Sequence, residues 1–156
     1  HEGTHGIQGL DLLGRKVRME GGAALKLLAT RIDATITRAG HVAGLAQDAN
    51  ALAAALARLG AATKAAWATG EPAEALANAT AYLQAFGHVV VAWLWLDVAL
   101  AAQRALDADA SRADFCRGKL AAMRYFFRHE LPKLGGWLAV VESRDTTCRD
   151  VDAAWL

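Results

Sequence analysis

Proline is nearly absent from this sequence, and its scarcity removes the strongest barrier to long helices. Only Pro72 and Pro132 occur among 156 residues, so long stretches contain no residue that would interrupt helical hydrogen bonding. Alanine fills many of those stretches, and they favour helices because alanine loses no side-chain entropy on becoming helical. No alternating apolar pattern indicates a strand. The sequence therefore predicts an all-α fold.

The sequence also lacks a marked excess of positive or negative charge. The 17 basic residues nearly balance the 16 acidic residues, which gives a net charge of +1 with the two signs interspersed. A field this weak excludes recognition of nucleic acid or of an acidic membrane by charge alone. Cysteine is scarce too, since Cys116 and Cys148 are too few for a disulfide framework. They fit a reducing cytoplasm and leave room for one bridge at most.

The sequence contains no hydrophobic run long enough to predict a membrane span. Its most apolar stretch, 86–102, includes His88 and Asp97, and only eight residues separate these two, whereas a span needs about 20 apolar residues. Such a stretch is typical of the central helix of a bundle. The opening residues HEGTHG contain neither a basic start nor an apolar signal segment. Because methionine does not come first, we expect this chain to be a fragment of a longer protein.

Hydrophobic periodicity predicts several helices with short connections. The predicted helices cover 7–16, 20–39, 42–68, 72–106 and 111–131, and a short helix or turn with a polar tail follows from 135. We expect Gly70 to end one helix and Pro72 to begin the next. Ser111 with Asp114 resembles a capping box. Short connections favour antiparallel neighbours, so we expect an antiparallel up-down bundle of four to five helices.

Each predicted helix carries an apolar stripe, with steps of three and four residues, that we expect to pack inward. We expect the helix at 72–106, which is apolar on several sides, to be the most buried. The expected stripes are Ile7, Leu10, Leu13; Leu25, Leu28, Ile32, Ile36; Val42, Leu45, Ala49, Leu52, Leu56, Leu59; Tyr82, Phe86, Val89, Trp93, Leu96, Leu100, with Val91, Trp95, Val98; and Phe115, Cys116, Leu120, Met123, Phe127.

The first five residues, HEGTH, match the H-E-x-x-H pattern of zinc peptidases. In that chemistry two imidazoles one helical turn apart bind zinc and the glutamate activates water. The pattern must lie in a helix, yet Gly3 and Gly6 disfavour one by about 1 kcal/mol each. His41, His88 and His129 offer no recognisable third ligand. A zinc peptidase is therefore a remote alternative, and no metal is expected.

The longer string HEGTHGIQGLDLLGRK resembles the segment E-G-T-x-G-I-Q-x-x-D-L-x-G-R-K of the acyl-CoA dehydrogenase family. It is similar above all to the larger branch with an extra helical C-terminal domain, as in the methylmercaptopropionyl-CoA dehydrogenases. The resemblance implies that 1–16 ends the catalytic domain and that 17–156 forms the C-terminal helical bundle domain. The matching positions are Glu2, Gly3, Thr4, Gly6, Ile7, Gln8, Asp11, Leu12, Gly14, Arg15 and Lys16.

The resemblance also implies a reaction and a role for each residue of the motif. In that family the glutamate removes a proton beside the thioester carbonyl, hydride passes to the flavin, and trans-2-enoyl-CoA forms. Glu2 is then the catalytic base, with its backbone N–H against the thioester oxygen. Gly3 lets the substrate approach closely, and Thr4, His5 and Gly6 contact the FAD diphosphate. Thr4 can also cap the following helix, whose free N–H groups attract phosphate.

For the intact enzyme the resemblance implies an acyl-CoA substrate, an electron-transfer acceptor, FAD, a homo-oligomer and a cytoplasmic location. The isolated fragment is expected to be inactive. Two positions depart from the family pattern: His1 stands where many members have tyrosine, and His5 where asparagine or a small residue is common. An alternative from another class is a helical module for interaction or oligomerisation that has no catalysis of its own.

Several residues outside the motif admit both a functional and a structural interpretation. Asp97 and His88 could form a buried polar site, or each could be hydrogen-bonded to a neighbouring helix or to solvent. An aromatic set could line an acyl pocket or pack in the core, and it comprises Trp93, Trp95, Tyr125, Phe126 and Phe127. Several basic residues could meet CoA or FAD phosphates or be solvated, and they are Arg15, Lys16, Arg124, Arg128 and Lys133.

Overall fold

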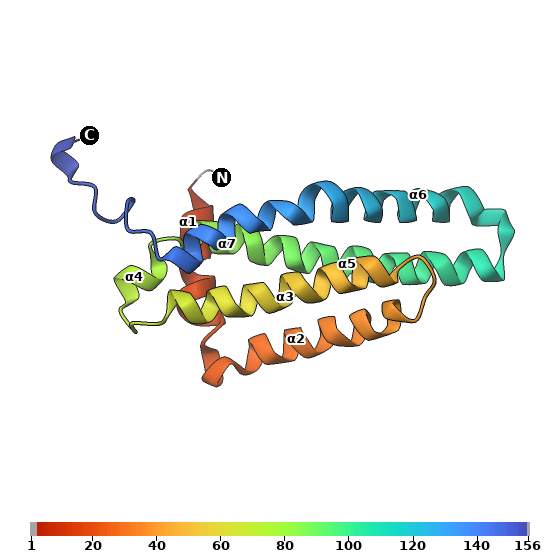
Figure 1. The fold of residues 1–156 in the computed structure, drawn as a ribbon, viewed down its shortest axis with the longest axis horizontal. Helices are drawn as coiled ribbons and strands as arrows, with labels where there is room; N and C mark the ends of the chain where they lie inside the picture. The colour runs from red at the N-terminus through yellow and green to blue at the C-terminus, as the bar shows by residue number, and fades with distance from the viewer. Residues whose placement is uncertain (1–2, 156) are drawn as a thin grey trace. The chain divides into compact units, whose positions relative to one another are not determined.

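The protein is built from helices, as predicted. The computed structural model describes residues 3–155, and within that range no strand occurs. The α-helices are α1 Thr4–Asp11, α2 Met19–Gly40, α3 Ala46–Ala66, α4 Pro72–Leu76, α5 Ala79–Ala108, α6 Ala113–Tyr125 and α7 Leu134–Ser143 (Figure 1). Wider π-helical turns occupy Leu12–Lys16 and Phe126–Glu130, and 3-10 turns occupy Ala110–Arg112, Leu131–Lys133 and Ala153–Trp155.

The chain divides into two compact units, and the long helices α2, α3 and α5 each contribute to both. The first unit takes its residues from His1–Leu27, Arg58–Phe86 and Gly135–Leu156. The second takes its residues from Leu28–Ala57 and Gly87–Leu134. The motif at the beginning of the sequence therefore belongs to the first unit.

The first helix begins earlier than the sequence pattern predicts. Gly3 is the N-cap residue of α1, with a left-handed φ of 89° and no side-chain capping bond, and the helix starts at Thr4 rather than at Ile7. The prediction that Thr4 is the N-cap is therefore wrong. A left-handed residue suits glycine, which has no Cβ to clash, and this turn lets the helix begin directly after it.

The predicted helix over 72–106 is two helices. Gly70 adopts the left-handed φ of 78° expected of a residue that ends a helix, and Pro72 lies in the first turn of α4. The chain then breaks at Ala77 and Asn78 before α5 begins. The Asn78 amide donates a hydrogen bond of 2.8 Å to the Asp145 carbonyl oxygen. This bond ties the break between α4 and α5 to a distant part of the chain, and the apolar periodicity does not register it.

The predicted capping box at Ser111 is also wrong. Ser111 lies in the 3-10 turn, and Arg112 is the N-cap residue of α6, without a side-chain capping bond. The Asp109 carboxylate instead accepts bonds of 2.8 Å from the Ser111 backbone N–H and 2.6 Å from its hydroxyl. Asp114 accepts a bond from Arg117. Aspartate at the start of a turn commonly bonds the backbone two residues on, which explains the alternative pattern.

The core of the first unit is made largely of small residues. Its buried hydrophobic members are Leu13, Val17, Leu59, Ala62, Ala66, Ala75, Ala79, Tyr82, Ala85, Leu138 and Val141. Ile7 and Leu10 were expected to lie with Leu13, but they are 70% and 47% exposed. Gly9 faces inward instead, where a Cβ atom would lie only 2.7 Å from the Ala79 carbonyl oxygen. The close approach of α1 to α5 thus requires glycine on the inner face.

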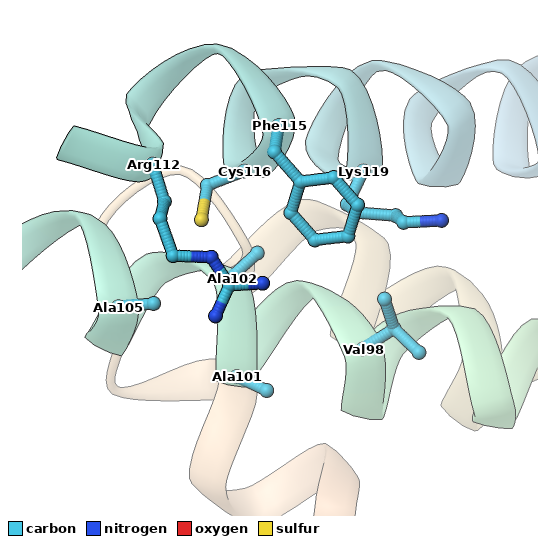
Figure 2. Close-up of a pocket in the computed structure, with 8 residues that line it drawn as sticks. All are labelled: Val98, Ala101, Ala102, Ala105, Arg112, Phe115, Cys116 and Lys119. Atoms are coloured by element: carbon cyan, nitrogen blue, oxygen red, sulfur yellow. The ribbon is translucent and has the colours of Figure 1, made fainter.

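The second unit packs larger side chains, and pairs of contacts fix the directions of its helices. Its largest fully buried side chains are Ile32, Thr35, Leu45, Leu52, Val89, Leu96 and Met123. Trp93 Nε1 donates to the Thr35 hydroxyl at 2.9 Å, and Arg38 donates to Asp97 at 2.7 Å. Residue numbers rise together along both contacts, so α2 and α5 run in the same direction here, although α5 and α6 run antiparallel (Figure 2).

Part of the apolar surface of α5 and α6 remains outside the core. Val91 and Val98 are each 39% exposed, Leu94 is 51% exposed and Phe115 is 56% exposed. The expected inward positions of Val91, Val98 and Phe115 are therefore wrong. The helix α5 is long and apolar enough to cross a membrane by length and composition, and 39% of its most apolar window is buried within the protein. A core helix passes the same test, so this helix is weak evidence for a span.

Candidate functional site

The motif residues gather at the exposed N-terminus of α1. Gly3, Thr4 and His5 are exposed, and Gly6 is half-buried with open space around its α-carbon. The predicted base, Glu2, lies outside the described residues, as does His1. Gly3 makes no side-chain capping bond, and this end of the eight-residue helix is the positive end of the helix dipole.

Two glycines and a tryptophan fix α1 and the following π-helical turn within the first unit. Gly9 lies against the backbone of Ala79, and a Cβ at Gly14 would touch the Leu76 side chain at 3.4 Å. Trp67 Nε1 donates a hydrogen bond of 3.2 Å to the Leu13 carbonyl oxygen. This bond satisfies a carbonyl in the widened turn, where the regular helical pattern is interrupted.

A cation–π contact adds to this attachment. The Arg18 guanidinium carbon lies 3.8 Å from the centre of the Trp67 ring. Trp67 therefore contacts the chain within the π-helical turn, through Leu13, and just after it, through Arg18. Together these contacts hold α1 and the π-helical turn against Trp67, α4 and α5, and the first residues of α1 are exposed.

The charged residues of the motif interact with each other. Arg15 Nε donates to an Asp11 carboxylate oxygen at 2.6 Å, one helical turn apart. This hydrogen bond from Arg15 is the main cause that lowers the pKa of the Asp11 carboxyl, and it raises the pKa of Arg15. Lys16 is exposed. Arg15 therefore makes a local ion pair on a solvated surface, which is the structural one of its two interpretations.

Asp97 and His88 do not form one polar site. Asp97 pairs with Arg38 and is about half exposed, with 52% of its side chain accessible. His88 Nε2 lies 3.8 Å from a carboxylate oxygen of Glu130. Glu130 also accepts a bond of 2.7 Å from Lys133, which is the first cause of its lowered pKa. Each residue thus meets a neighbouring helix or turn, as one of the two interpretations predicted.

The aromatic set does not converge on an acyl pocket. Phe127 is buried, Trp93 and Trp95 are half-buried, and Tyr125 is 60% exposed with its ring 4.7 Å from that of His129. Phe126 stacks at 5.7 Å on His88. These side chains face different neighbours, so the structure supports packing for this set and not a shared acyl pocket.

Two cavities in the second unit were not predicted from the sequence. One, of about 290 Å³, lies between α5 and α6 from Val98 to Ala105 and from Arg112 to Lys119 (Figure 2). The other, of about 390 Å³, includes Arg38, His41, Gln103, Arg104 and Asp107. No sequence signal marks these cavities, because they depend on how the helices pack; in the structure the exposed ring of Phe115 lies over the first.

No metal centre emerges from residues 3–155, where no group of three or more His, Cys, Asp or Glu side chains could hold an ion. Cys116 is buried and Cys148 exposed, and both are free thiols. The chemistry that the described part of the chain can offer is therefore a helix N-terminus able to bind an anion, and the apolar groove of the second unit.

Comparison with known proteins gives two findings. A family model described as "Acetyl-CoA dehydrogenase C-terminal like" matches residues 28–152. The broad-specificity linear acyl-CoA dehydrogenase FadE5 of Mycobacterium tuberculosis is 28% identical over 166 residues, which cover 99% of this chain and 27% of that protein. The chain thus spans about a quarter of the length of this curated relative.

Proposed function

Because the chain belongs to the acetyl-CoA dehydrogenase C-terminal-like family, we propose that it is the C-terminal part of a flavin-dependent acyl-CoA dehydrogenase. Residues 1–16 are the end of the catalytic domain, and 17–156 are the helical domain that follows. The observation that carries the proposal is the sequence motif of eleven matching positions, whose described part begins at the exposed N-terminus of α1. The similarity to a relative whose name specifies linear acyl-CoA substrates supports the substrate class.

In this proposal Glu2 is the base that takes a proton from the carbon next to the thioester carbonyl. A carboxylate can do this when its surroundings make it basic enough, and desolvation beside apolar groups raises its pKa. Its backbone N–H faces the thioester oxygen, where negative charge develops. Gly3, directly after it, has open space around its α-carbon and leaves room for the substrate.

The N-terminus of α1 fits the diphosphate of FAD. Thr4, His5 and Gly6 form its first turn, and a helix N-terminus attracts anions. These three residues would hold the phosphate groups. When bound, the flavin would accept the hydride from the β-carbon of the acyl chain. The residues of this chain contribute the proton acceptor and the anion-binding turn.

The surroundings of α1 also support a position beside the rest of the enzyme. Ile7 and Leu10 point outward, although apolar residues at helical spacing normally pack against protein. We propose that the catalytic domain covers them. The intact protein would take acyl-CoA as substrate, pass electrons to an electron-transfer acceptor, assemble as a homo-oligomer and act in the cytoplasm. The isolated 156 residues are proposed to be inactive.

The test is to replace Glu2 by Gln in the full-length protein. Losing the base should slow flavin reduction by acyl-CoA about 10²–10⁴-fold, as measured by bleaching of the flavin absorbance in an anaerobic stopped-flow experiment. Glu20→Gln is the matched control, because Glu20 carries the same group at an exposed position beyond the motif, and its rate should not change. Unchanged reduction in Glu2→Gln would contradict the catalytic role.

An interaction module without catalysis makes a different prediction. In that case the full-length protein would assemble normally. Acyl-CoA would fail to reduce any bound flavin in the unsubstituted protein as well as in Glu2→Gln. Measuring the mass in solution and the flavin spectrum of the same sample separates the two functions.

A further inference from the structure

The groove between α5 and α6 in the second unit combines an apolar surface with two cationic side chains (Figure 2). Its floor is formed on α5 by Val98, Ala101, Ala102 and Ala105, and the exposed ring of Phe115 stands over it from α6. Val98 is 39% and Phe115 56% exposed. Covering these carbon atoms would release water from apolar surface, so the groove favours a ligand with an alkyl chain.

The two cations both approach the ring of Phe115. The Arg112 guanidinium carbon lies 5.2 Å and the Lys119 ammonium nitrogen 5.1 Å from its centre. Figure 2 shows Arg112 reaching down toward α5, whereas Lys119 runs along α6. An alkyl chain in this groove would therefore meet positive charge beside its apolar surface.

The acidic side chains near Arg112 lie outside the groove, so its guanidinium is available to a ligand. None of the described residues that line the groove is acidic. Asp109, the carboxylate whose pKa Arg112 helps to lower, accepts its hydrogen bonds from Ser111. The planar donors of an arginine match a carboxylate in pairs, and such charge-assisted bonds are stronger than neutral ones.

We propose that this groove binds a medium-chain fatty-acid carboxylate. The alkyl chain lies along α5 from Ala105 to Val98 under Phe115, the carboxylate binds Arg112, and Lys119 adds positive potential. The helix rises about 10 Å over this length, and a cavity of about 290 Å³ is at the small end of ligand pockets, near 300 Å³. Both dimensions suit one medium chain. The site lies outside the motif region and does not depend on the proposed dehydrogenation.

Titration calorimetry of the 156-residue chain with decanoate tests the proposal. Decanoate should bind, and Arg112→Gln should weaken binding about tenfold or more, as expected for losing a hydrogen bond to a charged group. Ala101→Trp should abolish binding by filling the groove. Lys119→Gln should weaken it less than Arg112→Gln does. Decanol, which has the same chain without the charge, should bind at least about tenfold more weakly than decanoate.

Arg117→Gln is the matched control, since Arg117 lies on the same helix, is exposed, and pairs with Asp114 instead of lining the groove. Its affinity for decanoate should equal that of the unsubstituted chain. The proposal is overturned if decanoate does not bind, if decanol binds equally well, or if Arg117→Gln weakens binding as much as Arg112→Gln. Binding to anionic lipid vesicles or to an acidic peptide without binding of free decanoate overturns it too. Circular dichroism melts verify that the variants are folded.

Discussion

At the scale of single residues, the backbone at Glu20 is the least expected feature of this chain. Glu20 has a φ of 51° and a ψ of 44°, and the left-handed conformation continues through Gly21 and Gly22. Glycine adopts this conformation freely, whereas a side chain adds a clash of about 1–2 kcal/mol. These three residues form a kink before the long part of α2. The backbone strain at Glu20 is therefore a consequence of this kink.

Glu20→Gly should therefore stabilise the protein. The relief of strain is partly offset by the greater freedom of glycine in the unfolded chain, which leaves a gain of up to about 1 kcal/mol. Urea unfolding measured by circular dichroism tests this. Glu20→Ala removes the carboxylate but keeps a Cβ atom, so it should leave the stability nearly unchanged. If glycine destabilises the protein while alanine does not, the backbone at this position is not strained.

At the scale of elements, the sequence predicts the helices better than their breaks. Apolar periodicity correctly indicates α2, α3 and α6, because repeated burial every three or four residues leaves a clear pattern. It misses the break at Ala77 and Asn78, where the apolar pattern continues and the Asn78 amide bonds the distant Asp145 carbonyl oxygen. It also misplaces Ile7 and Leu10, because glycine in a close helix contact carries no hydrophobic signal. The motif predicted the candidate site by resemblance, whereas the groove depends on tertiary packing that no local pattern contains.

Gly9→Ala should loosen the attachment of α1 to α5. The new methyl group would lie 2.7 Å from the Ala79 carbonyl oxygen, and because this atom belongs to the backbone of α5, a helix must shift. Overpacking of this kind costs about 1–3 kcal/mol. Gly6→Ala is the matched control on the same helix, where a Cβ meets nothing within 4 Å, and it should stabilise by up to about 1 kcal/mol. Thermal melts of both variants check the opposite signs, and equal effects would contradict the close contact.

At the scale of the whole molecule, the pH dependence of unfolding reports one buried phenol. Tyr82 is fully buried, and this burial raises its pKa to about 12. The two hydroxyl oxygens lie 2.7 Å apart. Thr63 donates its own hydroxyl hydrogen to the Leu59 carbonyl oxygen, so the Tyr82 hydroxyl is the donor to Thr63. The folded state therefore keeps a proton that the unfolded chain releases near pH 10.

The sign of the resulting pH dependence follows from this difference. The contribution of Tyr82 is complete below pH 10 and is lost as the pH rises toward about 12, at about 1.4 kcal/mol per pH unit between the two pKa values. Tyr82→Phe should cost about 1 kcal/mol at pH 7 through the lost hydrogen bond, yet it should flatten the alkaline decline. Tyr125→Phe, at a 60% exposed position, should change neither. Urea unfolding between pH 8 and about 12 tests this, and an unchanged alkaline slope in Tyr82→Phe would mean that other groups cause the decline.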